Sequence, residues 1–320
     1  MSLSCRKRSP GSRAQLTLVS GANTGPTRVD CYGMADRHAP ALEALFRAAG
    51  VQFELRAAQS GEGESHQHGF SVSAARHPRL QTLARSGIHL YPVRSLRGVV
   101  PAAIPSIATV VASVPPGADR EAILNCAHLV STAMQKWSTL TVVNRSDCQP
   151  YLSTELPGMV VQAATAPEAM TALVEQAPDF LIVPEELAPS FAAASVALTG
   201  TATLAFEVQA KGDSLLFTHR SPGGDVEPTA LVFAFTWLLL LLGENAAAQR
   251  LHNAALRVLD DGLHTSALSL SNPYTRLLEP EALITATQDR LDKKPRQLAP
   301  VSYATRQTPP LNRSQLKRVL

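Results

Sequence analysis

Apolar and polar positions along the chain alternate in blocks that predict strands and helices in turn. Short apolar runs rich in β-branched residues predict strands, and apolar residues three and four positions apart predict amphipathic helices. The first block predicts a strand at 16–20, a helix at 40–49 that ends at Gly50, and a strand at 51–55. This strand–helix–strand unit is typical of an α/β fold.

The same alternation continues to about residue 291. One or two strands are expected within 99–114, where the chain is apolar and partly β-branched. The further strands are expected at 138–144, 179–184 and 214–218, and the further helices at 119–136, 167–176, 191–197, 228–242, 245–260 and 279–291.

The most apolar stretch of the chain runs from Leu231 to Gly243. It spans about 13 residues, whereas a helix that crosses a membrane needs roughly 20. We therefore expect a buried core helix or a dimer-interface helix here, and no transmembrane segment.

Composition and charge divide the chain into a body and two tails. The chain has 320 residues, of which 45% are hydrophobic, enough for one large domain or two closely joined ones. Residues 1–13 and 293–320 contain basic residues and no acidic ones, so the body between them carries about −8 although the whole chain carries +3. Such tails are either solvated ends or docking segments for RNA, lipid headgroups or an acidic protein surface.

The first tail is rich in Ser and Arg, which is typical of an organellar transit peptide, although Pro10 argues against an amphipathic helix. It is either such a segment or a basic N-terminal arm. The four cysteines are scattered without metal-ligand spacing, so we expect a reducing compartment and neither a disulfide framework nor a zinc site. Cys126 and Cys148 lie in apolar surroundings and are expected in the core.

Five segments, taken in chain order, resemble one protein family. They are LTLVSGANTGP, LARSGIHLYPVRSLRG, REAILNCAHLV with STLTVVNRSD, PDFLIVPEELAPSFAAASVALTG, and THRSPGGDVEPTALVFAFTWLLLLLGENAAAQRLHNAALRVLDDG. In these segments the chain resembles the isocitrate/isopropylmalate dehydrogenases, which are NAD(P)-dependent β-decarboxylating dehydrogenases. The resemblance implies an α/β fold of two domains around a mixed sheet, and a family that usually works as a dimer with shared active sites.

The chain is accordingly expected to have three parts. A basic N-terminal arm or transit-like segment covers 1–14, and the isocitrate/isopropylmalate dehydrogenase-like domain covers 15–292. An extended basic C-terminal arm covers 293–320, where prolines recur and apolar periodicity is weak.

The resemblance places the family's catalytic groups on residues that lack their chemistry. Two substrate-binding arginines fall on Gln81 and Tyr91, and the catalytic lysine falls on Arg145. The Asp pair that binds the metal falls on Ser190 and Ala194. Only Arg offers a bidentate fork to a carboxylate, and an Arg in the lysine position stays protonated and cannot act as a base. The resemblance therefore implies a chain without catalytic activity and without a bound metal.

Three other acidic residues lie near the expected metal site. The remaining family Asp falls near Pro167, and the adjacent Glu168 alone does not make a metal site. Glu185 and Glu186 follow the strand at 179–184 and are expected to face solvent.

Nucleotide-binding positions are also altered. His219 matches the family's His, and Asp225 stands in place of its Asp, but Glu227 replaces the Asn that faces the adenine. The opening turn keeps Gly21 and Gly25 but has lost an acid and a third glycine, which matters where the backbone must approach a ligand closely. We treat these residues as vestigial and expect no cofactor.

The sequence thus predicts a catalytically inactive dehydrogenase-fold protein in mitochondria. It would act as a structural or accessory subunit of a large assembly, either a respiratory-chain complex or the mitochondrial ribosome, and its partners would be the protein subunits of that assembly. Dimerisation with itself or with another dehydrogenase-like subunit is also open. The alternative is a non-catalytic regulatory subunit of a heteromeric NAD-dependent isocitrate dehydrogenase, and an active dehydrogenase of unusual specificity is a third interpretation.

Overall fold

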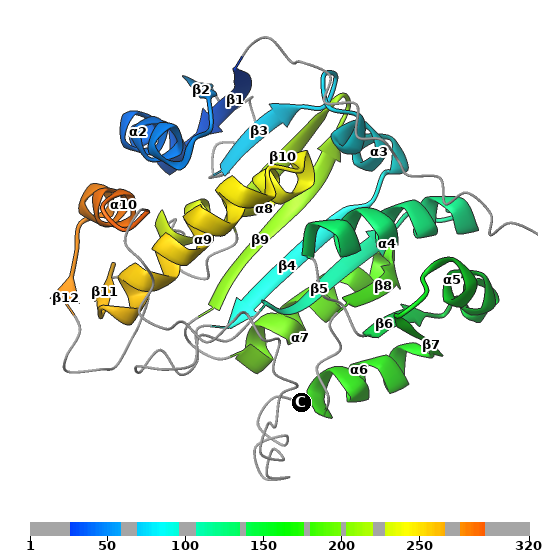
Figure 1. Ribbon diagram of the computed structural model, residues 1–320. Helices are drawn as coiled ribbons and strands as arrows, with labels where there is room; N and C mark the ends of the chain where they lie inside the picture. Colours follow the sequence, from blue (N-terminus) through cyan, green and yellow to red (C-terminus); the bar gives the residue numbers. More distant parts are fainter. Residues whose placement is uncertain are drawn as a thin grey trace, which may run out of the picture.

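The computed structural model describes residues 26–58, 69–95, 107–134, 139–175, 180–199, 203–219, 228–265 and 276–291. The predicted strand at 16–20, the turn with Gly21 and Gly25, and both basic tails lie outside these ranges. Within them the chain forms one large mixed sheet with helices packed on it (Figure 1).

Strands and helices are interspersed along the described chain. The strands are β1 (Thr27–Tyr32), β2 (Phe53–Ala57), β3 (Gly69–Ser73), β4 (His89–Ser95), β5 (Ile107–Val114), β6 (Thr139–Val143), β7 (Val160–Ala164), β8 (Phe180–Pro184), β9 (Thr203–Lys211), β10 (Ser214–His219), β11 (Leu263–His264) and β12 (Arg276–Leu277). The helices are α1 (Met34–Arg37), α2 (Ala39–Ala49), α3 (Pro78–Ser86), α4 (Arg120–Met134), α5 (Gln149–Glu155), α6 (Ala166–Glu175), α7 (Ala188–Thr199), α8 (Pro228–Leu242), α9 (Asn245–Asp260) and α10 (Pro280–Gln288).

The sheet joins ten of these strands in the order β2-β1-β3-β10-β9-β4-β5-β8-β6-β7. Its two ends are parallel: β1 pairs with β2, and β5, β8, β6 and β7 run in one direction. The strands between them pair antiparallel. The predicted mixed sheet is therefore confirmed.

Alternating side chains of β4 show that both faces of the sheet are covered. Leu90 lies in the main hydrophobic core, and the next residue, Tyr91, lies in a second cluster with Phe191 of α7. Neighbouring residues of a strand point to opposite faces. Helices α3, α4 and α8 therefore cover one face, which is nearer the viewer in Figure 1, and α6 and α7 cover the other.

Helix α8 forms the centre of the main core, as its apolar sequence predicts. Nearly every residue of it is buried, and the Phe235 ring stacks on Phe70 with centroids 3.9 Å apart. The Phe235 ring also lies 4.4 Å, between centroids, from the Phe46 ring of α2, so the contact joins α2 to α8. In the described part of the chain, no helix is long and apolar enough to cross a bilayer.

Strands β1 and β2 with helix α2 form a strand–helix–strand unit, and the strand expected at 16–20 lies outside the described residues and stays a prediction. The strand parallel to β2 is β1, and α2 connects the pair. Only Val29 and Cys31 of β1 are buried, while Arg28 and Asp30 alternate with them on the other face. A strand with only two buried apolar residues gives a weak signal in the sequence, so β1 was not predicted. Strand β1 leads into Gly33, which has a φ of 63°.

One sheet runs through the described chain from β1 to β10. The predicted domain boundaries at 14 and 292 border segments outside the described ranges, so that division stays a prediction.

Candidate functional site

The carboxyl ends of the parallel strands β5, β6, β7 and β8 lie on one side of the sheet, and several residues singled out by the sequence follow these ends. Arg145 comes after β6, Glu168 after β7, and Glu185 and Glu186 after β8. Ligands of open α/β sheets bind outside the carboxyl ends of the strands, so a binding site is expected beside these strand ends.

Arg145 is held there by three groups of the chain itself. Its Nε donates to Asp147 Oδ1 at 3.1 Å, and its Nη1 donates to the Ala118 carbonyl at 3.0 Å. Its Nη2 donates to the Cys148 Sγ at 3.2 Å. These bonds join the loop after β5 to the turn after β6, which gives Arg145 a structural role.

The same network fixes the charge states of its members. The hydrogen bond to Asp147 raises the pKa of Arg145 further, so its guanidinium stays protonated. In return, the hydrogen bond from Arg145 lowers the pKa of Asp147. Burial, followed by a hydrogen bond to Asp147, raises the pKa of the Cys148 thiol. None of these three groups is prepared to take up a proton near neutral pH.

Glu168 is used as a helix cap. Its Oε2 accepts hydrogen bonds from the Thr165 amide and hydroxyl, both at 2.8 Å, at the start of α6. The backbone bond lowers the pKa of Glu168. Asn144, with a φ of 56°, adds a second cap because its Oδ1 accepts from the Ala166 amide at 3.2 Å. This carboxylate therefore supports the fold of α6.

Tyr91, Ser190 and Ala194 lie on the α7 side of the sheet. Tyr91 is buried in the second cluster, against which Ala194 packs, and Ser190 is exposed on α7. As predicted, Glu185 and Glu186 are exposed, in a 3₁₀ turn before α7. Cys126 and Cys148 are buried, also as predicted.

Gln81 lies apart from these residues. It belongs to α3, on the opposite face of the sheet, and its Nε2 donates to the Ala75 carbonyl at 2.7 Å. The structure thus brings Tyr91 and Ala194 into one cluster, but it leaves Gln81 and Arg145 in two other places.

The positions aligned with nucleotide and metal binding give little further geometry. His219 is the last residue of β10, and Gly21, Gly25 and Asp225 lie outside the described residues. Within the described ranges, no three His, Cys, Asp or Glu residues lie close enough together to hold a metal ion.

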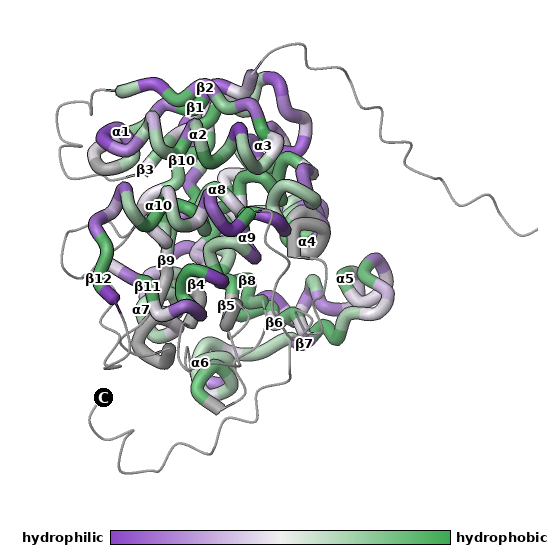
Figure 2. Tube along the Cα trace, turned by 60° about the vertical axis from the view of Figure 1, so that its left-hand side comes forward, coloured by the Kyte–Doolittle hydropathy of each residue, from purple (hydrophilic) through white to green (hydrophobic). Residues whose placement is uncertain are grey.

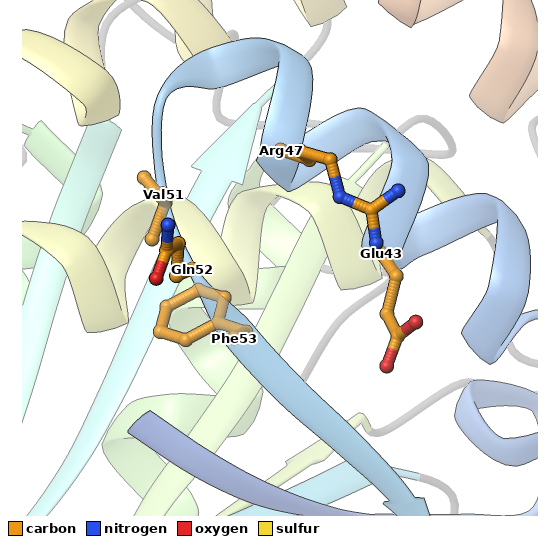
Figure 3. A pocket seen from close by; sticks show the side chains of 5 residues that line it. All are labelled: Glu43, Arg47, Val51, Gln52 and Phe53. Carbon is orange, nitrogen blue, oxygen red and sulfur yellow. The ribbon is translucent and has the colours of Figure 1, made fainter. Parts of the chain in front are cut away.

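An open hollow of about 250 Å³ lies elsewhere, between α2 and the start of β2. It is lined by Glu43, Arg47, Val51, Gln52 and Phe53 (Figure 3). Glu43 extends from the helix toward the strand, and its Oε1 accepts the Leu55 amide at 3.1 Å. No sequence pattern singled out Glu43, because its partner lies in a different element.

The fold is similar to those of two solved structures. The TT0538 protein from Thermus thermophilus matches with a TM-score of 0.58 and 15% sequence identity, over 86% of this chain and 70% of that chain. Isocitrate dehydrogenase from Methylococcus capsulatus matches with a TM-score of 0.54 and 15% identity, over 79% of this chain and 94% of that chain. Neither a family model nor a curated protein sequence matches the chain. The chain therefore has an isocitrate dehydrogenase-like fold, as predicted, and at this identity the likeness shows the fold alone.

Proposed function

We propose that this chain is a catalytically inactive protein of isocitrate dehydrogenase-like fold that serves as a structural or accessory subunit of a large mitochondrial assembly. The observation that carries the proposal is the binding of Arg145 by Asp147, Ala118 and Cys148. The resemblance assigns this position to the catalytic lysine. Here it is occupied by a side chain that cannot act as a base and that makes structural contacts instead.

Two further features support the proposal. The positions of the metal carboxylates hold Ser190 and Ala194, which offer no charged oxygen to a cation. The acid-free tails at 1–13 and 293–320 provide basic segments for docking on RNA, lipid headgroups or an acidic protein surface. A scaffold needs the fold and a docking surface, but it does not need the catalytic groups.

The test is to isolate the tagged full-length chain from mitochondria under native conditions and to identify what sediments with it. We expect the chain in a large particle, with either ribosomal proteins and rRNA or the subunits of a respiratory-chain complex. Recovery as a free protein, with no large particle in any fraction, would refute the assembly role.

A second candidate is the non-catalytic regulatory subunit of a heteromeric NAD-dependent isocitrate dehydrogenase. The fold likeness to isocitrate dehydrogenase favours it. The same isolation distinguishes the two, because this candidate requires catalytic isocitrate dehydrogenase subunits to travel with the chain and isocitrate oxidation to be measurable in that fraction.

A further inference from the structure

Strand β2 forms one edge of the large sheet, and its outer side presents a short row of main-chain groups. The Thr27 amide donates to the Gln52 carbonyl, and the Ala58 amide donates to the Cys31 carbonyl. In a parallel pair this pattern turns the even-numbered residues of β2 toward β1. The amides and carbonyls of Phe53, Leu55 and Ala57 therefore point outward, where the described sheet has no further strand.

The polar face of β1 and β2 carries charges in an alternating pattern. Arg28 lies opposite Glu54, and Asp30 lies opposite Arg56. Within each strand the charges also attract, since Arg28 Nε lies 3.0 Å from Asp30 Oδ1 and Arg56 Nε lies 2.8 Å from Glu54 Oε1. All four side chains are partly exposed. Figure 2 shows the alternation of hydrophilic and hydrophobic positions along β1 and β2.

We propose that β2 pairs antiparallel with β2 of a second copy of this chain, about a two-fold axis at Leu55. This register places Glu54 opposite Arg56 of the second copy and Phe53 opposite its Ala57. Each charge row then continues across the axis with alternating sign: Arg28 and Glu54 of one copy are followed by Arg56 and Asp30 of the other. Directly opposed unlike charges stabilise a strand pair, and like charges destabilise it.

The charge pattern is what commits the edge to a second copy. An antiparallel partner strand for this edge needs a basic residue opposite Glu54 and an acidic residue opposite Arg56. Read in the partner's own direction, the acidic residue comes first and the basic residue follows two positions later. Strand β2 itself has this order, with Glu54 before Arg56. A two-fold axis makes the two sets of contacts identical and closes the assembly at a dimer. This inference does not depend on the proposed function.

Glu43 competes with the second copy. Its carboxylate occupies the Leu55 amide, which the proposed pairing needs at its centre. Arg47 and Phe53 line the hollow beside this contact, and the small Ala57 of the second copy would lie opposite Phe53. The wild-type dimer is therefore weak, and loss of the hydrogen bond that position 43 accepts from the Leu55 amide strengthens it.

The other edge of the sheet lacks such a pattern. The outward carbonyl of Val161 in β7 accepts a hydrogen bond from the Gln149 Nε2 at 3.2 Å, and β7 has no charged residue to set a register. The β2 edge is therefore the one at which a second copy can be recognised.

Sedimentation equilibrium of the full-length chain from about 1 to 300 μM tests the pairing. We expect concentration-dependent dimerisation that A57P abolishes, because proline removes an outward amide and leaves the bonds to β1 in place. R56E should weaken dimerisation about tenfold or more, since it opposes Glu54 to an acid twice. The double variant E54R/R56E should restore it, although that variant places like charges opposite Arg28 and Asp30 within each copy.

Amide hydrogen exchange gives an independent measurement. The Leu55 amide is bonded in the monomer, whereas the Phe53 and Ala57 amides should become protected only as the protein concentration rises. A chain that stays monomeric over the whole range would overturn the proposal. Association that A57P leaves unchanged would also overturn it, because another surface would then be responsible. Protection of the Phe53 and Ala57 amides that does not depend on protein concentration would overturn it as well.

Discussion

The Glu43 carboxylate accepts a hydrogen bond from the Leu55 amide at 3.1 Å, on the outer edge of the sheet. A glutamate of α2 thereby occupies a main-chain donor of the edge strand β2. Edge strands with unpaired main-chain groups can pair with another chain, and charged side chains limit that pairing. Gln149 acts in the same way on the Val161 carbonyl at the opposite edge.

Replacement of Glu43 should uncover the edge of β2. We expect E43A to lower the free energy of unfolding by about 0.5–1.5 kcal/mol, the usual net value of one hydrogen bond, and to increase self-association. E43Q keeps an oxygen that can accept the Leu55 amide, so it is the matched control and should resemble the wild type. Urea unfolding and light scattering measure the two effects. Equal behaviour of E43A and E43Q in both would contradict the protective role.

Gly69 should be irreplaceable for a steric reason. A Cβ built at this position would lie 1.9 Å from the carbonyl oxygen of Phe217, in the neighbouring strand β10. The contact is with backbone, so relief requires separation of two paired strands. We expect G69A to destabilise the chain by more than about 3 kcal/mol or to prevent folding. G212A is the control: it meets no atom within 4 Å and should cost only about 1–2 kcal/mol for its left-handed backbone. Similar unfolding midpoints for the two variants would disprove the steric argument.

The sequence predicted those elements whose burial is complete. Helix α8 and strand β8 are continuous apolar runs, and both lie where they were expected. Strands with mixed surroundings were missed. β9 contains Glu207 and Gln209, and β4 contains Pro92 beside a break in its register with β5. A proline argues against a central strand when only local pattern is considered, and the irregular pairing that accommodates it is a tertiary feature.

The candidate site could be predicted only as separate residues. The family resemblance marked Arg145 as a residue that cannot act as the family's base, but it did not indicate what Arg145 contacts. Its bond to the Ala118 carbonyl spans 27 positions and depends on the adjacent ends of β5 and β6. The cap formed by Glu168 could be predicted from the sequence, because Thr165 and Glu168 have the spacing of a capping box.

Asp147 should make stability depend on pH in the acidic range. Its pKa in the folded chain is lowered from the usual 3.8, first by the hydrogen bond from Arg145. A group with a lowered pKa contributes stability above its unfolded pKa, and that contribution is lost as the pH falls through the lower, folded pKa. D147N should therefore be less stable than the wild type at pH 7, and the difference should shrink as the pH falls below 3.8. Urea midpoints between pH 7 and pH 2.5 give the comparison. A difference that persists at the acidic end would assign the effect to packing.

The proposed loss of catalysis predicts that dehydrogenase ligands leave the chain unaffected. We expect no rise in the melting temperature with isocitrate, Mg²⁺ and NAD, each added alone and together. Binding at 100 times Kd would stabilise the folded state by about 2.7 kcal/mol, which differential scanning fluorimetry detects readily. An active isocitrate dehydrogenase under the same conditions is the positive control. A stabilisation of several degrees by any of these ligands would argue for a surviving site and would favour the regulatory-subunit alternative.

The basic C-terminal segment should be needed for assembly but not for folding. It contains Lys293, Lys294, Arg296, Arg306, Arg313, Lys317 and Arg318, with no acidic residue. Deletion of 293–320 should leave the melting temperature unchanged and abolish co-sedimentation with the large particle, because the docking charges are gone. Replacement of the seven basic residues by Gln keeps the length and removes the charge, so it separates the two contributions. If electrostatics dominates, the Gln variant should behave like the deletion, and wild-type binding should weaken steeply with salt. Full incorporation of the deletion variant would show that the folded body alone holds the chain in its complex.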